Sequence, residues 1–191
     1  AAKRIVLRAA AGAIDIDIPE VRVWVENGEC RIKACPHPRT SVIVREMMVL
    51  GGEAAARWAF DRAIPFPFYS QEAPETRENL PPGIAGEFAK RRLMKAGMAG
   101  TQPMAHRGLG LSFYAQATSP LRRYSDLLAH QQIRAFLRGG ETLSDDQASE
   151  RLGRALAALA LNRQAERASQ SHWTHVFLSH HQKWEGDAIV V

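Results

Sequence analysis

Asn27 and Gly28 limit most strongly how this chain can fold. They separate the segments VRVWVE and ECRIKAC, in which apolar and polar side chains alternate. Alternation with a period of two is typical of strands, and an Asn-Gly pair adopts the positive φ angles of a two-residue hairpin turn at low cost. The sequence therefore predicts an antiparallel hairpin, within a strand-forming region that we expect to cover residues 5–35.

A long helix is predicted after the hairpin, over about residues 40–62, because its apolar residues recur close to helical spacing. Gly51 and Gly52 fall in its middle, where each costs about 1 kcal/mol relative to alanine. We interpret this glycine pair as a place where another element or a ligand comes close to the helix. A proline-rich connection follows, and then a short basic helix is predicted over residues 87–97.

Two further helices are predicted in the second half of the chain. Ser119 and Pro120 have the residue types preferred at the N-cap and at the first position of a helix, which we expect to end near Arg138. A capping-box pattern that begins at Ser144 opens another long helix, which ends between residues 171 and 180. The combination of a hairpin with long helices predicts a mixed, α+β fold.

The composition favours an anionic partner and a reducing compartment. Lysine and arginine number 25 against 20 aspartate and glutamate residues, which gives a net charge of +5. An excess of this size suits nucleic acid but is weak evidence by itself. Two cysteines do not make a disulfide framework, so we expect a cytoplasmic protein. The apolar runs are too short to span a membrane, so no membrane partner is expected.

Arg122 and Arg123 lie in the first turn of the helix predicted from Ser119, where the helix dipole disfavours cations by about 0.3–1 kcal/mol each. On a helical wheel Arg123 falls on the polar face, whereas Arg122 falls beside the apolar arc and should be partly buried. Arg122 therefore needs a negative partner. Asp126 is one alternative, and a phosphate bound at the helix N-terminus is the other.

Residues 106–130, HRGLGLSFYAQATSPLRRYSDLLAH, closely resemble the signature of the ribonuclease II/ribonuclease R (RNB) family of 3′→5′ exoribonucleases. The segments RAAAGAIDIDIPE, VREMMVLGGEAAARW and PFPFYSQEAPE resemble other elements of the same catalytic domain, so the resemblance covers most of residues 4–185. It implies that residues 1–183 are the C-terminal part of that domain. Residues 184–191 (WEGDAIVV) would then be the first strand of a C-terminal OB-fold RNA-binding domain.

The resemblance also implies an activity and the residues that carry it. Such enzymes hydrolyse single-stranded RNA from the 3′ end to nucleoside 5′-monophosphates, with Mg²⁺ as cofactor. The arginine that stabilises the scissile phosphate corresponds to Arg122, which is the expected catalytic residue. The same comparison implies that four neighbouring residues support this arginine or contact the RNA backbone: Arg123, Tyr124, Thr118 and Ser119.

Two departures from the family pattern limit these expectations. The metal-binding aspartates of the family lie upstream of the segment at Asp15 and Asp17, so we expect Mg²⁺ ligands in the remainder of the same enzyme and none in this chain. Where the family has two adjacent acids, this chain has Arg45 and Glu46, and Glu46 is the residue left to contact the substrate. The alternative is a non-catalytic, RNA-binding relative that has kept the fold and lost the metal chemistry.

Overall fold

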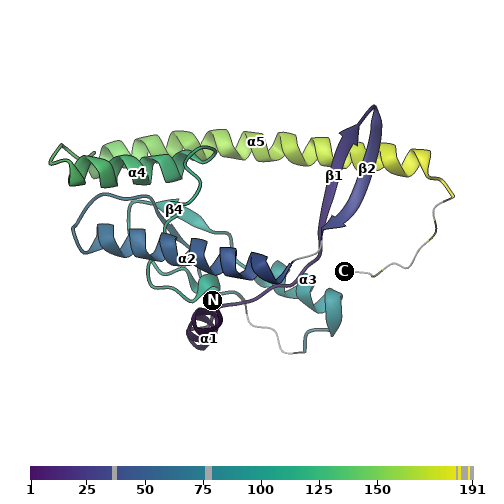
Figure 1. Ribbon diagram of the computed structural model, residues 1–191, viewed down its shortest axis with the longest axis horizontal. Coiled ribbons are helices and arrows are strands. Elements are labelled where there is room, and N and C mark those ends of the chain that lie inside the picture. The colour runs from purple at the N-terminus through teal and green to yellow at the C-terminus, as the bar shows by residue number, and fades with distance from the viewer. Residues whose placement is uncertain (36–37, 76–78, 184, 186–188, 190–191) are drawn as a thin grey trace. The chain divides into compact units, whose positions relative to one another are not determined.

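The computed structural model describes residues 1–35, 38–75, 79–183, 185 and 189, and it confirms the α+β fold (Figure 1). Its α-helices are α1 Ala2–Ala10, α2 Arg39–Phe60, α3 Gly83–Leu93, α4 Tyr124–Leu137 and α5 Asp145–His180. Its strands are β1 Glu20–Glu26, β2 Glu29–Cys35, β3 Phe68–Ser70 and β4 Met98–Gly100, and a 3₁₀ turn, η1, spans Arg107–Leu109. Within the described residues, no helix combines the length and apolarity needed to cross a lipid bilayer.

The chain divides into two compact units. The first unit comprises residues 1–15, 39–78 and 93–156, and the second comprises residues 16–38, 79–92 and 157–191. All predicted site residues belong to the first unit. The predicted strand over 184–191 falls almost entirely on residues outside the described ones.

The predicted hairpin is confirmed in the second unit. Strands β1 and β2 pair antiparallel from Glu20 opposite Cys35 to Glu26 opposite Glu29. Asn27 and Gly28 form the two-residue turn with φ angles of 52° and 83°, as the sequence predicts.

The core of the first unit lies between α2, α4 and the segment that leads into β3. Its buried apolar side chains are alanines of the two helices and of residue 115, together with larger side chains of residues 64–68: Ala56, Ala59, Ile64, Phe66, Phe68, Ala115 and Ala129. Strand β3 pairs antiparallel with β4, from Phe68 opposite Gly100 to Ser70 opposite Met98. This packing fixes the C-terminal half of α2 against the start of α4, and the site described below lies where these elements meet.

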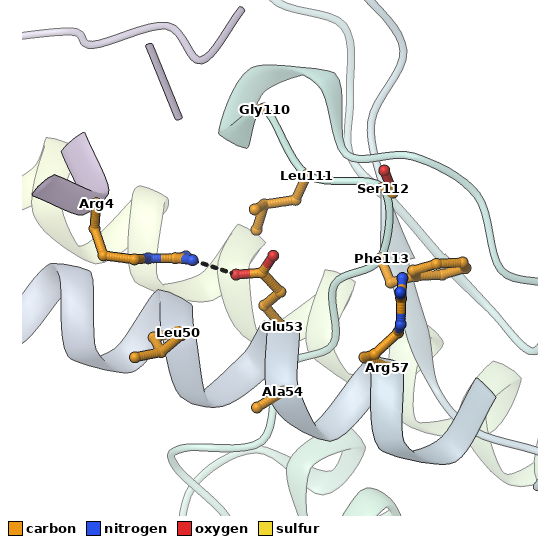
Figure 2. Close-up of a pocket in the computed structure, with 9 residues that line it drawn as sticks. All are labelled: Arg4, Leu50, Glu53, Ala54, Arg57, Gly110, Leu111, Ser112 and Phe113. Atoms are coloured by element: carbon orange, nitrogen blue, oxygen red, sulfur yellow. Dashed lines mark ion pairs between the residues drawn. The ribbon is translucent and has the colours of Figure 1, made fainter. Parts of the chain in front are cut away.

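The strand predicted to begin at residue 5 is wrong, because residues 2–10 form α1. Arg4 and Arg8 are one helical turn apart and pair with two carboxylates of α2. Arg4 Nη1 lies 2.6 Å from Glu53 Oε2 (Figure 2), and Arg8 Nη1 lies 2.5 Å from Glu46 Oε1. Both arginines therefore lie on the face of α1 that packs against α2.

The other helix predictions are confirmed except at their ends. Helix α2 begins and ends within two residues of the prediction, and α5 begins with the expected capping box. Its two reciprocal hydrogen bonds run from Gln147 N to Ser144 Oγ (3.3 Å) and from Ser144 N to Gln147 Oε1 (3.1 Å). Helix α3 ends at Leu93 and not at Gly97. Gly97 instead makes room for the Tyr69 ring, which a Cβ atom would approach to 2.7 Å.

Candidate functional site

Helix α4 begins at Tyr124, four residues after the first helical position, Pro120, that the sequence predicted. Residues 119–123 form a turn in which the N–H groups of Arg122 and Arg123 both donate to Ser119 O, at 3.2 and 3.0 Å. Arg123 is the N-cap residue, with an extended backbone (φ −127°, ψ 118°). The helical wheel therefore does not apply to Arg122 or Arg123, and the environments that it predicted for them are wrong.

Asp126 fixes this turn to the helix. Its side chain is fully buried in the first turn of α4, where the positive end of the helix dipole favours an anion. Asp126 Oδ2 accepts hydrogen bonds from Ser119 N at 2.7 Å and from Arg123 Nη2 at 2.8 Å. Ser125 Oγ donates to Asp126 Oδ1 at 3.2 Å. Asp126 therefore holds residues 119–123 in a non-helical turn, where the sequence predicted the first turn of the helix.

The two arginines have environments opposite to those the wheel predicted. Arg123 forms the ion pair with Asp126 and keeps only 25% of its side chain exposed. Arg122 is exposed, and within the described part of the chain its guanidinium forms no hydrogen bond or ion pair. Thr118, Leu121 and Tyr124 are exposed beside it. The turn thus presents one uncompensated cation among polar, apolar and aromatic side chains, a combination suited to a phosphodiester backbone.

The segment that leads into the turn lies directly on the glycine pair of α2. Ala115 N donates to Gly52 O at 3.3 Å. A Cβ atom on Gly52 would lie 2.3 Å from Ala115 O and 2.5 Å from Tyr114 Cε2, whereas one on Gly51 would meet only Thr118 Cγ2, at 3.6 Å. The predicted close approach at this glycine pair is confirmed, and Gly52 is the residue that requires it.

Alanine substitutions at the two glycines are expected to have opposite effects on stability. Gly52→Ala should lower the free energy of unfolding by about 1–3 kcal/mol, because the new methyl group collides with a backbone carbonyl and a buried ring. Gly51→Ala should raise it by up to about 1 kcal/mol, since the methyl group fits and alanine favours the helix. Urea unfolding of the full-length protein compares the two variants, and equal shifts would contradict the packing described here.

Burial shifts the pKa values of two titratable side chains in the segment before this turn. Burial raises the pKa of Tyr114; the positive charge of Arg123 opposes this effect, and the negative charge of Asp126 adds to it. Burial lowers the pKa of His106, and the charge of Arg8 lowers it further. The His106 ring stacks on Tyr69, with centroids 5.9 Å apart, and meets the Tyr114 ring edge-on at 5.5 Å. We interpret both as packing residues that support residues 114–118.

Glu46 is a buried member of an ion pair. It is 1% exposed, and its Oε1 pairs with Arg8, while its predicted contact with the substrate stays a prediction. Arg45 is half exposed and pairs with Asp15 at 3.1 Å. The carboxylate of Asp15 thus compensates the arginine that stands where the family has an acid.

A pocket of about 480 Å³ lies between α1, α2 and residues 110–113 (Figure 2). The nine residues that line it include none of the predicted site residues. Each of its two arginines has a carboxylate partner, Arg4 with Glu53 at 2.6 Å and Arg57 with Asp61 at 3.5 Å. Arg57 also lies over the Phe113 ring, 5.5 Å from its centroid. Both pocket arginines thus have a carboxylate partner among the described residues, whereas Arg122 has none, so the turn at Arg122 is the better candidate site for a phosphate.

The residues present do not fit a metal centre. Across residues 1–35, 38–75 and 79–183, no three histidine, cysteine, aspartate or glutamate side chains come together in a group that could hold a metal ion. Magnesium prefers carboxylate oxygens and usually keeps several waters. Asp126, the acid that holds this turn, is fully buried and already accepts hydrogen bonds from Ser119 and Arg123.

Comparison with known proteins decides the family. A sequence model of the RNB domain matches residues 85–139, which include the turn and α4. A ribonuclease of Synechocystis sp. is 37% identical over 97% of this chain. The chain belongs to the RNB family. This RNB chain is also 35% identical, over 70% of its length, to the chloroplastic/mitochondrial ribonuclease II of Arabidopsis thaliana.

Solved structures share the fold of the RNB chain. An active-site mutant of the Dss1 exoribonuclease from Candida glabrata superposes with a TM-score of 0.82 at 17% identity, covering 94% of this chain and 25% of its own. Ribonuclease R of Mycoplasma genitalium, in complex with double-stranded RNA, has a TM-score of 0.71 at 19% identity and covers 93% and 40%. The RNB chain spans 29% of the Synechocystis relative and 18% of the Arabidopsis relative.

Proposed function

We propose that this chain forms one wall of the active site of a hydrolytic exoribonuclease, which degrades single-stranded RNA from its 3′ end to nucleoside 5′-monophosphates. The observation that carries the proposal is the exposed guanidinium of Arg122, which has no ion-pair partner among the described residues, on a turn fastened to the start of α4. That turn lies inside the segment that matches the RNB domain. Relatives named as ribonucleases support the same activity.

Each residue of the turn receives a role that its environment allows. Arg122 binds the scissile phosphate and stabilises the negative charge that grows on its oxygens during hydrolysis. Thr118 and Tyr124 are exposed and contact the RNA backbone. Ser119 supports the turn, because its backbone N–H donates to the buried carboxylate of Asp126. Arg123 is held by Asp126 and supports the turn.

The chemistry of metal activation belongs to the remainder of the enzyme. Mg²⁺ is the proposed cofactor, and we place its ligands in the part of the enzyme outside this chain, because no three metal-ligating side chains come together among the described residues. Cytoplasmic RNA turnover is the proposed setting, because Cys30 and Cys35 are free thiols, as is usual in reducing compartments.

The activity is tested with the full-length protein and a single-stranded RNA labelled at its 5′ end. The expected result is a ladder of labelled products that shortens from the 3′ end, stops when EDTA is added and resumes with excess Mg²⁺. A labelled strand that keeps its full length, or that is first cut internally, would contradict the proposal.

One observation favours a second candidate, a non-catalytic RNA-binding relative. Arg45 replaces a family acid, and its pairing with Asp15 shows that the surrounding residues accommodate the change. Such a protein would bind the same RNA with an affinity that falls steeply with salt concentration, and it would leave the strand intact.

A further inference from the structure

One carboxylate oxygen joins the two ends of the segment that carries Arg122. Asp126 Oδ2 accepts a hydrogen bond from the backbone N–H of Ser119 at 2.7 Å, and it pairs with Arg123 Nη2 at 2.8 Å. Ser119 and Arg123 are the first and last residues of the turn, so Asp126 closes it as a clamp. Asp126 is fully buried, whereas Arg122 between the two ends is exposed.

The clamp also determines the charge that the turn presents. Asp126 neutralises Arg123, and within the described chain the Nε of Arg123 is buried without a hydrogen-bond partner, so the pair is largely shielded from water. A buried carboxylate that pairs with one cation has little left to attract another. Arg122 therefore keeps its full positive charge for a ligand.

We propose that Asp126 and Arg123 are positioning residues, which hold residues 119–123 so that the Arg122 guanidinium meets the scissile phosphate in the transition state. This inference rests on the proposed function of Arg122. A group that must stabilise developing charge gains from being fixed before the substrate arrives, and a displacement of about 1 Å can cost as much as about 100-fold in rate. The Arg122 side chain forms no hydrogen bond or ion pair among the described residues, so the turn holds it through its backbone.

The alternative is that Asp126 only stabilises the start of α4, as an acid in the first turn of a helix commonly does. The two roles differ in whether the effect of Asp126 on the rate depends on Arg122. A merely stabilising residue should affect catalysis equally whether or not Arg122 is present. A residue that acts through Arg122 should matter only while Arg122 is there.

The test is a double-mutant cycle in the full-length protein with single-stranded RNA, combining Asp126→Asn with Arg122→Ala. Asparagine keeps an oxygen for the Ser119 N–H but loses the charge that holds Arg123. Asp126→Asn is expected to lower kcat by at least about tenfold and to change KM by no more than about twofold. In the Arg122→Ala background, the same substitution is expected to lower the single-turnover rate by less than about twofold.

A matched control and a second variant complete the experiment. Glu150→Gln removes an exposed carboxylate that pairs with Arg154, and it is expected to leave kcat and KM unchanged. If Asp126→Asn does not fold, as judged by circular dichroism, Arg123→Gln breaks the same ion pair from its more exposed side and carries the same expectations.

Two groups of outcomes would overturn these statements separately. The positioning role is wrong if Asp126→Asn leaves kcat near wild type, or lowers the rate by the same factor in both backgrounds, while Arg122→Ala still abolishes most turnover. A wild-type protein that does not shorten RNA, or an Arg122→Ala variant with wild-type turnover, rejects the proposed function itself and the positioning role with it.

Discussion

Replacing Arg122 with alanine in the full-length protein is expected to lower the turnover of single-stranded RNA by at least about 100-fold. The substitution removes a cation that has no partner among the described residues, so the fold loses no interaction there. The loss should therefore appear in kcat, with unchanged circular dichroism and unfolding temperature. Arg122→Lys should recover only a small part of the rate, because an ammonium group cannot hold two phosphate oxygens in the bidentate manner of a guanidinium.

Arg134 provides a matched control for this experiment. It is another exposed arginine, on α4 itself and away from the turn, and Arg134→Ala removes the same charge from the same unit. We expect turnover to stay within about twofold of wild type for this variant. Equal losses for both variants would mean that only the overall positive charge matters, and the specific role of Arg122 would be wrong.

Breaking the buried ion pair between Arg8 and Glu46 is expected to give the largest loss of stability. Glu46→Ala should lower the free energy of unfolding by about 3–5 kcal/mol, because the guanidinium of Arg8 would remain buried without its partner. Arg8 is 9% and Glu46 1% exposed, so water cannot compensate the charge that is left. Arg8 Nε also donates to Leu109 O at 2.9 Å, which couples the loss to the loop that leads toward the site.

Urea unfolding of the full-length protein, followed by tryptophan fluorescence, measures this effect. Glu150→Ala, which breaks the exposed pair with Arg154, should shift the midpoint very little by comparison. If the urea midpoint of Glu46→Ala were as close to wild type as that of Glu150→Ala, the buried pair would not stabilise the fold.

Local signals in the sequence predict much of this fold because they act over a few residues. The Asn27-Gly28 turn and the capping box at Ser144 are each decided by neighbouring backbone angles and hydrogen bonds, and both are confirmed. Long-range contacts decided the predictions that failed. The Ile-Val-Leu run has a strand-like pattern, but it lies in helix α1, whose Arg4 and Arg8 pair with carboxylates of α2 far along the chain.

The start of α4 shows the same division at the candidate site. Ser119 and Pro120 predict a helix start at Pro120, but the helix begins at Tyr124, and Asp126 stands three residues after the observed N-cap, Arg123. An acid in the first turn is itself a recognised signal of a helix start, so the sequence also contained a signal for the observed start. Sequence alone could not show that the carboxylate is buried, nor that it takes Arg123 and leaves Arg122 free.

A structure of the full-length protein with an uncleavable single-stranded RNA bound tests most directly whether Arg122 binds the scissile phosphate. We expect the Arg122 guanidinium to lie within about 3 Å of oxygens on the phosphate nearest the 3′ end, while Arg123 remains paired with Asp126. Arg123 bound to that phosphate, or Arg122 directed into solvent away from the RNA, would contradict it.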